Sequence, residues 1–240
     1  ALMDLGIRLK GDVLLSCVIG EELGQKQWGV VPATKKFQEK EINIDFCIDP
    51  EPTNNEIHIL SAGTFDFSIR ISGKEVHVSM KNLTQYPQRY GIPVGKEVGV
   101  DAIAIMVDLL QRLSRLEHEW NMRHTDEIFG GGGYPIPKDM QGVGANSLTC
   151  TLIEGGTYIA SVPGYAKATG LVYYSPRLNS EKLCEEMKEV ANGMAATYDW
   201  LKEHPIELKC KEVFDWPAYE VSRDHPGVKA LVKAYEAVTG

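Results

Sequence analysis

At 240 residues, the chain is long enough to bury a sizeable core, either as one domain or as two modest domains. Its formal net charge of -8 at pH 7 argues against a nucleic-acid or anionic-membrane partner, because no dense basic surface is available. No apolar run approaches the length that crosses a bilayer, so the composition favours a small-molecule partner.

The cysteines bear on the cellular compartment. They are odd in number, widely spaced and set mostly in apolar runs: Cys17, Cys47, Cys150, Cys184 and Cys210. This pattern predicts buried free thiols in a reducing compartment, and therefore a cytoplasmic location. The chain opens at Ala1 without a signal peptide, so we expect its start to be processed or cut from something longer, and we favour the cut.

The first third of the chain has the pattern of a βαβ unit. Continuous apolar runs occupy Asp12 to Ile19 and Ile44 to Asp49, with a helix-compatible stretch from Pro32 to Lys40 between them. Runs without polar alternation are typical of parallel strands buried on both faces. The crossover rule places the two strands side by side or nearly so.

The pattern changes at Gly63, where apolar and polar residues begin to alternate and a new domain is predicted. Asp101 is a candidate cap for a helix that runs to about Glu117. The apolar stripe expected on that helix consists of Ile103, Met106, Val107, Leu110 and Leu113.

Three further elements complete this domain. Strands fit Asn146 to Glu154 and Tyr165 to Tyr174, and Ser180 is a candidate cap for a helix that ends before Pro205. The apolar face of that helix is Leu183, Met187, Val190, Met194, Tyr198 and Leu201. With a last strand from Ile206 to Val213, the order is βαββαβ, which is the ferredoxin-like split unit.

The remaining segment contains a helical stretch from Gly227 to Val238 and is interpreted as a return to the first domain. The predicted boundaries are therefore residues 1–62 for part of the first domain, 63–213 for the inserted domain and 214–240 for the returning segment. The predicted fold class combines α/β and α+β.

Acidic clusters follow both predicted parallel strands. Glu21 and Glu22 come after the first strand, and Glu51 follows the second within the sequence from Asp49 to Thr53. Open α/β sheets place their sites at these carboxyl ends. Converging carboxylates repel one another unless a cation or a shared proton neutralises them, so the clusters are a candidate metal site. For any single glutamate, a solvated loop residue is the commoner explanation.

His77 lies at the turn after the first strand of the inserted domain. Taken by itself, such a histidine is more often a surface or capping residue than a catalytic one. The other histidines lack ligand spacing relative to one another.

Several stretches together resemble the co-catalytic zinc hydrolases that include acetylornithine deacetylase, succinyl-diaminopimelate desuccinylase, aminoacylase and glutamate carboxypeptidase. The matching stretches are Gly11–Gly24, Asp49–Thr53, Phe67–Ser79, Gly99–Ile103, Ile153–Thr157 and His225–Gly240. Their order and spacing span the whole chain. The resemblance implies part of a parallel-sheet zinc-peptidase catalytic domain with an inserted ferredoxin-like lid and dimerisation domain.

The same resemblance implies roles for four residues. Glu21 would be the general base, Glu22 a ligand to one zinc, and Glu51 a ligand to the other. His77 would reach across a homodimer, formed through the lid, and stabilise the oxyanion in the partner's site. In such a mechanism the metal polarises the scissile carbonyl and lowers the pKa of bound water, while a carboxylate takes the proton.

The implied function is metal-dependent hydrolysis of an amide bond in N-acyl amino acids or short peptides, with zinc, cobalt or manganese as the metal. The family's remaining metal ligands fall outside this chain, so we expect an incomplete fragment. Two lid positions depart from the family: Ala160 replaces an asparagine, and Tyr173 replaces an arginine. The alternative interpretation is an inactive dimerisation or binding module of the same family.

Overall fold

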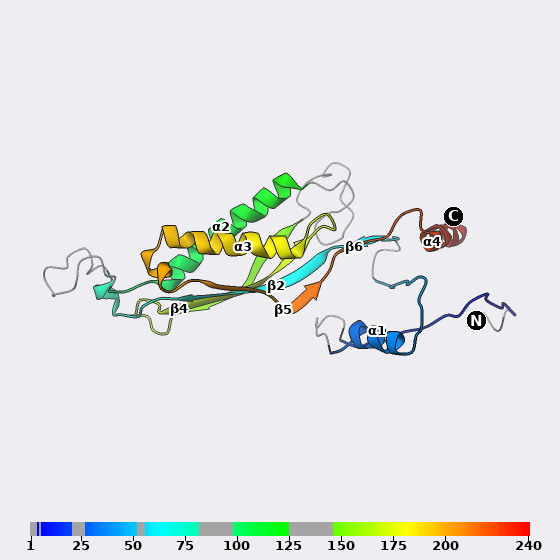
Figure 1. Cartoon of the computed structure of the whole chain (residues 1–240), viewed down its shortest axis with the longest axis horizontal. Helices are drawn as coiled ribbons and strands as arrows, with labels where there is room; N and C mark the ends of the chain where they lie inside the picture. The colour runs from blue at the N-terminus through cyan, green and yellow to red at the C-terminus, as the bar shows by residue number, and fades with distance from the viewer. Residues whose placement is uncertain (1–3, 5, 21–26, 52–55, 82–97, 125–145) are drawn as a thin grey trace. The chain divides into compact units, whose positions relative to one another are not determined.

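The computed structural model describes residues 4, 6–20, 27–51, 56–81, 98–124 and 146–240 (Figure 1). The chain divides into two compact units, residues 1–50 and residues 51–240, and each is described by itself. None of the helices in the described ranges combines the length and apolarity that crossing a bilayer requires.

The first unit contains helix α1 (Val30–Glu39), which confirms the helix predicted near Pro32. The parallel strands predicted at Asp12–Ile19 and Ile44–Asp49 are wrong for the described residues, because neither run pairs into a ladder. A parallel strand buried on both faces needs paired neighbours and covering layers, and these runs are exposed, Leu15 at 83%. The thiols of Cys17 and Cys47, expected to be buried, are exposed with them.

The second unit is built around a four-stranded antiparallel sheet, and it confirms the predicted βαββαβ order. Its elements are β2 (Gly63–Ser72), α2 (Ala102–Arg123), β3 (Ser147–Gly155), β4 (Tyr165–Tyr174), α3 (Ser180–Gly193) and β5 (Glu207–Trp216). The strand order is β3-β4-β2-β5, as in ferredoxin-like folds. Both helices lie on one face of the sheet (Figure 1).

The core lies between that face and the helices. Alternation in β2 turns Phe65, Phe67, Ile69 and Ile71 inward, and each is 2% exposed or less. The inward stripe of α2 contains Ala102, Ile105, Met106, Leu109, Leu113, Leu116 and Trp120.

The stripe predicted for α2 was partly wrong. Met106 and Leu113 are buried as expected, whereas Ile103 and Val107 are 36% and 47% exposed. The helix carries apolar residues on two faces, and contact with the sheet selects the face that contains Leu109.

The helix ends are set by polar side chains. Asp101 caps α2 as predicted, because its carboxylate accepts a hydrogen bond from the Ala104 amide at 3.0 Å. The cap of α3 is Asn179 rather than the predicted Ser180, since the Asn179 side chain accepts from the Lys182 amide. α3 also ends earlier than predicted, at Gly193, and continues as short 3-10 turns at Met194–Ala196 and Asp199–Lys202.

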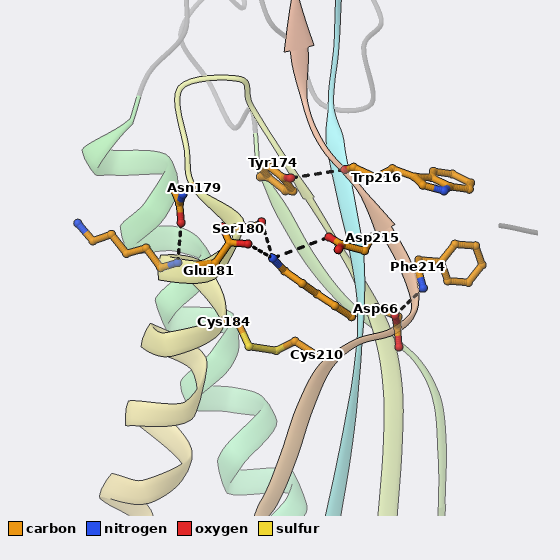
Figure 2. Close-up of polar contacts among 12 residues, drawn as sticks. Asp66, Tyr174, Asn179, Ser180, Glu181, Cys184, Cys210, Phe214, Asp215 and Trp216 are labelled. Carbon is orange, nitrogen blue, oxygen red and sulfur yellow. Dashed lines mark hydrogen bonds and ion pairs between the residues drawn. A yellow bond between two sulfur atoms is a disulfide. The ribbon is translucent and has the colours of Figure 1, made fainter. Parts of the chain in front are cut away.

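Three contacts attach the start of α3 to β5 (Figure 2). Lys211 donates from Nζ to Ser180 and Glu181 at 2.7 and 2.6 Å, and a disulfide joins Cys184 to Cys210. The prediction of free thiols is therefore wrong for this pair, whose Cα atoms lie 6.4 Å apart, within bridging range. The backbone of Lys211 has φ 64°, which costs about 1–2 kcal/mol in a non-glycine residue. Its side-chain contacts with Ser180 and Glu181 hold this backbone next to α3.

Short elements close the second unit. β1 (Leu60–Ser61) pairs antiparallel with β6 (Tyr219–Glu220), just before β2 begins and just after β5 ends. An ion pair between Arg177 and Glu220 connects the β4–α3 loop to β6. α4 (Pro226–Thr239) follows, capped by His225, and corresponds to the helix predicted there.

Candidate functional site

The candidate site lies at the end of the sheet where β2 ends, after Ser72. Backbone hydrogen bonds there join the segment after β2 to two others. Lys74 forms a bridge with Val100, before α2, and the Val76 carbonyl accepts from the Val162 amide, before β4, at 2.8 Å. Glycine is needed at position 73, where a Cβ would lie 2.4 Å from the Val100 carbonyl oxygen. These contacts make the segment around His77 part of the folded sheet domain.

His77 is held by its own backbone neighbourhood. It forms an isolated bridge with Ser161, and the next amide, that of Val78, donates to the Ala160 carbonyl at 2.9 Å. The His77 ring caps the 3-10 turn Val78–Met80, because Nδ1 accepts a hydrogen bond from the Ser79 amide at 3.3 Å. The capping role expected for an isolated histidine is thus observed.

This cap determines which ring nitrogen is available for chemistry. The Ser79 hydroxyl lies 2.8 Å from the same Nδ1 atom that accepts the Ser79 amide. A neutral imidazole whose Nδ1 accepts must carry its proton on Nε2. His77 is exposed, so in this tautomer Nε2–H is available to a group outside the domain.

Electrostatics near this segment are set by Lys81 and Asp101, whose charged atoms lie 2.6 Å apart. Burial raises the pKa of the Asp101 carboxyl, but hydrogen bonds from Lys81 and the Ala104 amide outweigh it and leave the pKa lowered. The ion pair therefore fixes the start of α2 next to the His77 segment.

The predicted metal site is not assembled by the described residues. Glu51 is exposed in an irregular segment, and Glu21 and Glu22 lie outside the described ranges. Within those ranges, no group of three or more His, Cys, Asp or Glu side chains could hold a metal ion. The described donors therefore do not fit a two-metal site on their own, and the roles of the three glutamates stay predictions.

Sequence reasoning missed Ser79 and the segment that supports His77. The signal for Ser79 is a hydroxyl residue two positions after a histidine at a turn, a spacing that permits a local cap. No sequence period links Ala160 or Ser161 to His77, since they are paired only by the fold. Of the two positions that depart from the zinc hydrolase pattern, Ala160 contributes its backbone carbonyl here, and Tyr173 lies on β4 at 38% exposure.

A hollow of about 350 Å³ lies elsewhere in the second unit, between residues 57–60 and α4. Its walls are mostly apolar, including Ile57, Val228 and Val232, with His58 and Arg223 at its polar positions. This composition suits apolar contact more than acid–base chemistry.

Comparisons with known proteins agree with this architecture. Residues 94–199 match the model of a peptidase dimerisation domain. The chain is 26% identical, over 99% of its length, to an N-formyl-4-amino-5-aminomethyl-2-methylpyrimidine deformylase of Bacillus subtilis. It is also 26% identical, over 98% of its length, to the protein of that name from Halalkalibacterium halodurans. It covers 52% and 51% of these proteins, so it spans about half the length of the curated relatives it matches.

A solved structure shows the same fold. The tripeptidase of Staphylococcus aureus aligns with 92% of this chain at a TM-score of 0.57 and 15% identity, and 46% of that protein is covered. α2, β3, β4 and α3 lie within the segment that matches the dimerisation model, residues 94–199, whereas β2, His77 and β5 lie outside it. Residues 94–199 are therefore similar to a peptidase dimerisation domain, and the second unit has the fold of such a domain.

Proposed function

We propose that this chain belongs to a metal-dependent hydrolase of amide bonds, in which the sheet domain is a lid that dimerises and contributes His77 to catalysis. The names of the two curated relatives describe removal of a formyl group from nitrogen, which is amide cleavage, and the chain matches them over nearly all of its own length. Since it covers about half of theirs, the activity belongs to the complete protein.

The observation that carries the proposal is the local cap of the His77 ring, in which Nδ1 accepts a hydrogen bond from the Ser79 amide. Amide hydrolysis develops negative charge on the carbonyl oxygen, and a preorganised N–H donor stabilises that charge without reorganising during the reaction. The Ser79 contacts at Nδ1 leave Nε2–H as that donor. A histidine meant as a metal ligand or a general base needs a free lone pair on the outward nitrogen instead.

Dimerisation is supported by exposed apolar side chains on α2 and the edge strand β3. Ile103 and Val107 of α2 are exposed, and Ile153 of β3 is 57% exposed. Among the described strands β3 pairs with β4 alone, so its outer edge has backbone groups available for pairing. A two-fold contact between copies covers the edge and the apolar side chains together.

The finer assignments are part of this proposal. Glu21 acts as the base, and Glu22 and Glu51 bind the metal, for which zinc, cobalt or manganese is suitable. The substrate is a small N-acyl amine, and N-acyl amino acids and short peptides are the classes proposed from the sequence. The relatives' names add N-formyl compounds to the set worth testing.

The test uses the complete protein, loaded with each metal in turn and assayed for release of the acyl group from N-formyl and N-acetyl amines and from dipeptides. Glu21→Gln should abolish turnover while metal content stays nearly unchanged, because a proton acceptor need not coordinate. Glu39→Gln, in the exposed face of α1, is the matched control and should be fully active.

His77→Asn tests the lid's contribution. We expect it to lower kcat by about 100-fold, as removal of an oxyanion donor does, with dimerisation unchanged. His118→Asn changes an exposed histidine of α2 and should have no effect. If the protein dimerises and binds these substrates but hydrolyses none of them, the result would favour the alternative interpretation, an inactive dimerisation or binding module. Metal loss in Glu21→Gln would reassign that residue as a ligand.

A further inference from the structure

The disulfide between Cys184 and Cys210 lies where β5 stops being a regular strand (Figure 2). β5 pairs with β2 as far as Cys210 and resumes at Asp215, while β2 advances by only two residues. Residues 211–214 of β5 therefore lie opposite a single residue of β2, Asp66, and form a bulge. The disulfide fixes β5 to α3 directly before this β5 bulge.

Two neighbouring residues of β5 attach to α3 at this point. Successive side chains of a strand normally point to opposite faces of the sheet. Cys210 and Lys211 nevertheless both contact α3, and the backbone of Lys211 leaves the strand conformation with φ 64°. The Lys211 ion pair is made with Glu181, whose side chain is 68% exposed, and such pairs contribute little by themselves. The disulfide is therefore the strongest connection between α3 and the start of the β5 bulge.

The two sulfur atoms differ in their access to solvent. Cys184 is 7% exposed, whereas Cys210 is only partly buried. A thiolate from solution therefore reaches the Cys210 sulfur more readily. The chain also has exposed free thiols at Cys17 and Cys47, and such thiols persist where the surroundings are reducing. In those surroundings a disulfide is more often transient or redox-sensing than structural.

We propose that the bond between Cys184 and Cys210 is a redox switch for the β5 bulge, opened by a small thiol of the glutathione type. A thiolate attacks the Cys210 sulfur, forms a mixed disulfide there and releases Cys184 as a thiolate that takes up a proton. A second thiolate attacks the small-thiol sulfur of the mixed disulfide and releases Cys210, which also takes up a proton. The protein gains two electrons and two protons, and the two small thiols leave as their own disulfide.

Opening the bond affects the base of the sheet domain. The β5 bulge leads through the end of β5 to β6, and β6 pairs with β1 where the chain enters and leaves the sheet. The core does not depend on this connection, because α3 also buries Leu183 and Met187 against it. Reduction therefore frees residues 211–216 and leaves the central strand β4 protected. This switch is independent of the proposed hydrolase activity.

The experiment places the complete protein in buffers with increasing ratios of reduced to oxidised glutathione. Alkylation and peptide mass mapping report the state of Cys184 and Cys210, and circular dichroism follows folding in the same buffers. We expect the bond to open while the protein stays folded. Hydrogen exchange of residues 211–216 should then become at least about tenfold faster, with the exchange of residues 165–174 unchanged.

Variants supply the reference states. Cys184→Ala and Cys210→Ala each remove the bond and should show the fast exchange of residues 211–216 without any added thiol. Cys150→Ala changes a free, partly buried thiol of β3 and is the matched control, with wild-type exchange. If the bond survives in every glutathione buffer that leaves the protein folded, it is a structural cross-link and the inference is overturned. The inference also fails if opening the bond unfolds the whole domain, or if it leaves the exchange of residues 211–216 unchanged.

Discussion

Replacing Gly170 with alanine should destabilise the sheet domain strongly. Gly170 lies on β4 between β2 and β3, opposite Phe67 and Cys150. A Cβ at this position would lie 2.0 Å from the Thr149 carbonyl oxygen and 2.6 Å from the Phe67 ring. The first obstacle is backbone inside a strand ladder, and the second is a fully buried side chain, so neither can move aside alone.

The expected loss follows from that geometry. Overpacking a close-packed core costs about 1–3 kcal/mol, and the backbone obstacle places Gly170→Ala near the upper value, about 3 kcal/mol. With a urea dependence of about 1–3 kcal/mol per molar, the unfolding midpoint should fall by at least about 1 M. Circular dichroism during urea titration measures this change, and the slope should stay close to that of the wild type.

Gly193→Ala is the matched control. Gly193 ends α3 with φ -61°, and a Cβ there meets no atom within 4 Å. Removing backbone freedom from the unfolded chain should raise the free energy of unfolding by about 0.4–1 kcal/mol. If Gly170→Ala unfolds within about 0.5 kcal/mol of the wild type, the close approach of β3, β4 and Phe67 described above is incorrect.

Three other substitutions test separate parts of the domain. Asp101→Ala should cost about 1 kcal/mol at pH 7 through loss of the helix cap. Because the pKa of Asp101 is lowered from 3.8, its carboxylate stabilises the fold above that value, and the difference from wild type should shrink as pH falls through the lowered pKa in urea titrations. Cys184→Ser opens a disulfide that spans 26 residues and should cost about 3 kcal/mol, as should treating the wild type with dithiothreitol. Ser79→Ala should lower kcat about fivefold at constant KM by loosening His77, with recovery in Ser79→Thr.

The sheet domain was predictable because its signals are local. Alternation from Gly63, the cap at Asp101 and the strand pattern of Tyr165–Tyr174 each set one element without reference to the others. The buried face of α2 could not be predicted from local sequence. Ile103 and Ile105 both belong to apolar stripes, and packing against the sheet determines which stripe is buried. The Cys184–Cys210 bond also depends on tertiary packing, because it needs α3 to lie over β5.

The two proposed halves of the site, His77 and the three glutamates, also differ in how far local sequence predicts them. The local cap of His77 comes from a residue two positions away, so a histidine followed by a hydroxyl residue within one turn is a sequence signal for this contact. The glutamates at positions 21, 22 and 51 require strands to converge, and no local pattern specifies that convergence.

A donor that acts outside its own domain needs more than the correct tautomer. Its position must be as rigid as the domain, because about 1 Å of misplacement weakens a hydrogen bond to a developing charge. The Val76–Val162 and Val78–Ala160 hydrogen bonds meet this requirement by joining the His77 segment to the turn that follows β3. Since β3 is also the edge strand available for pairing between copies, the proposed dimer contact and His77 share one rigid structure. Dimerisation through β3 would then position the donor, and loss of that contact should reduce kcat before it affects folding.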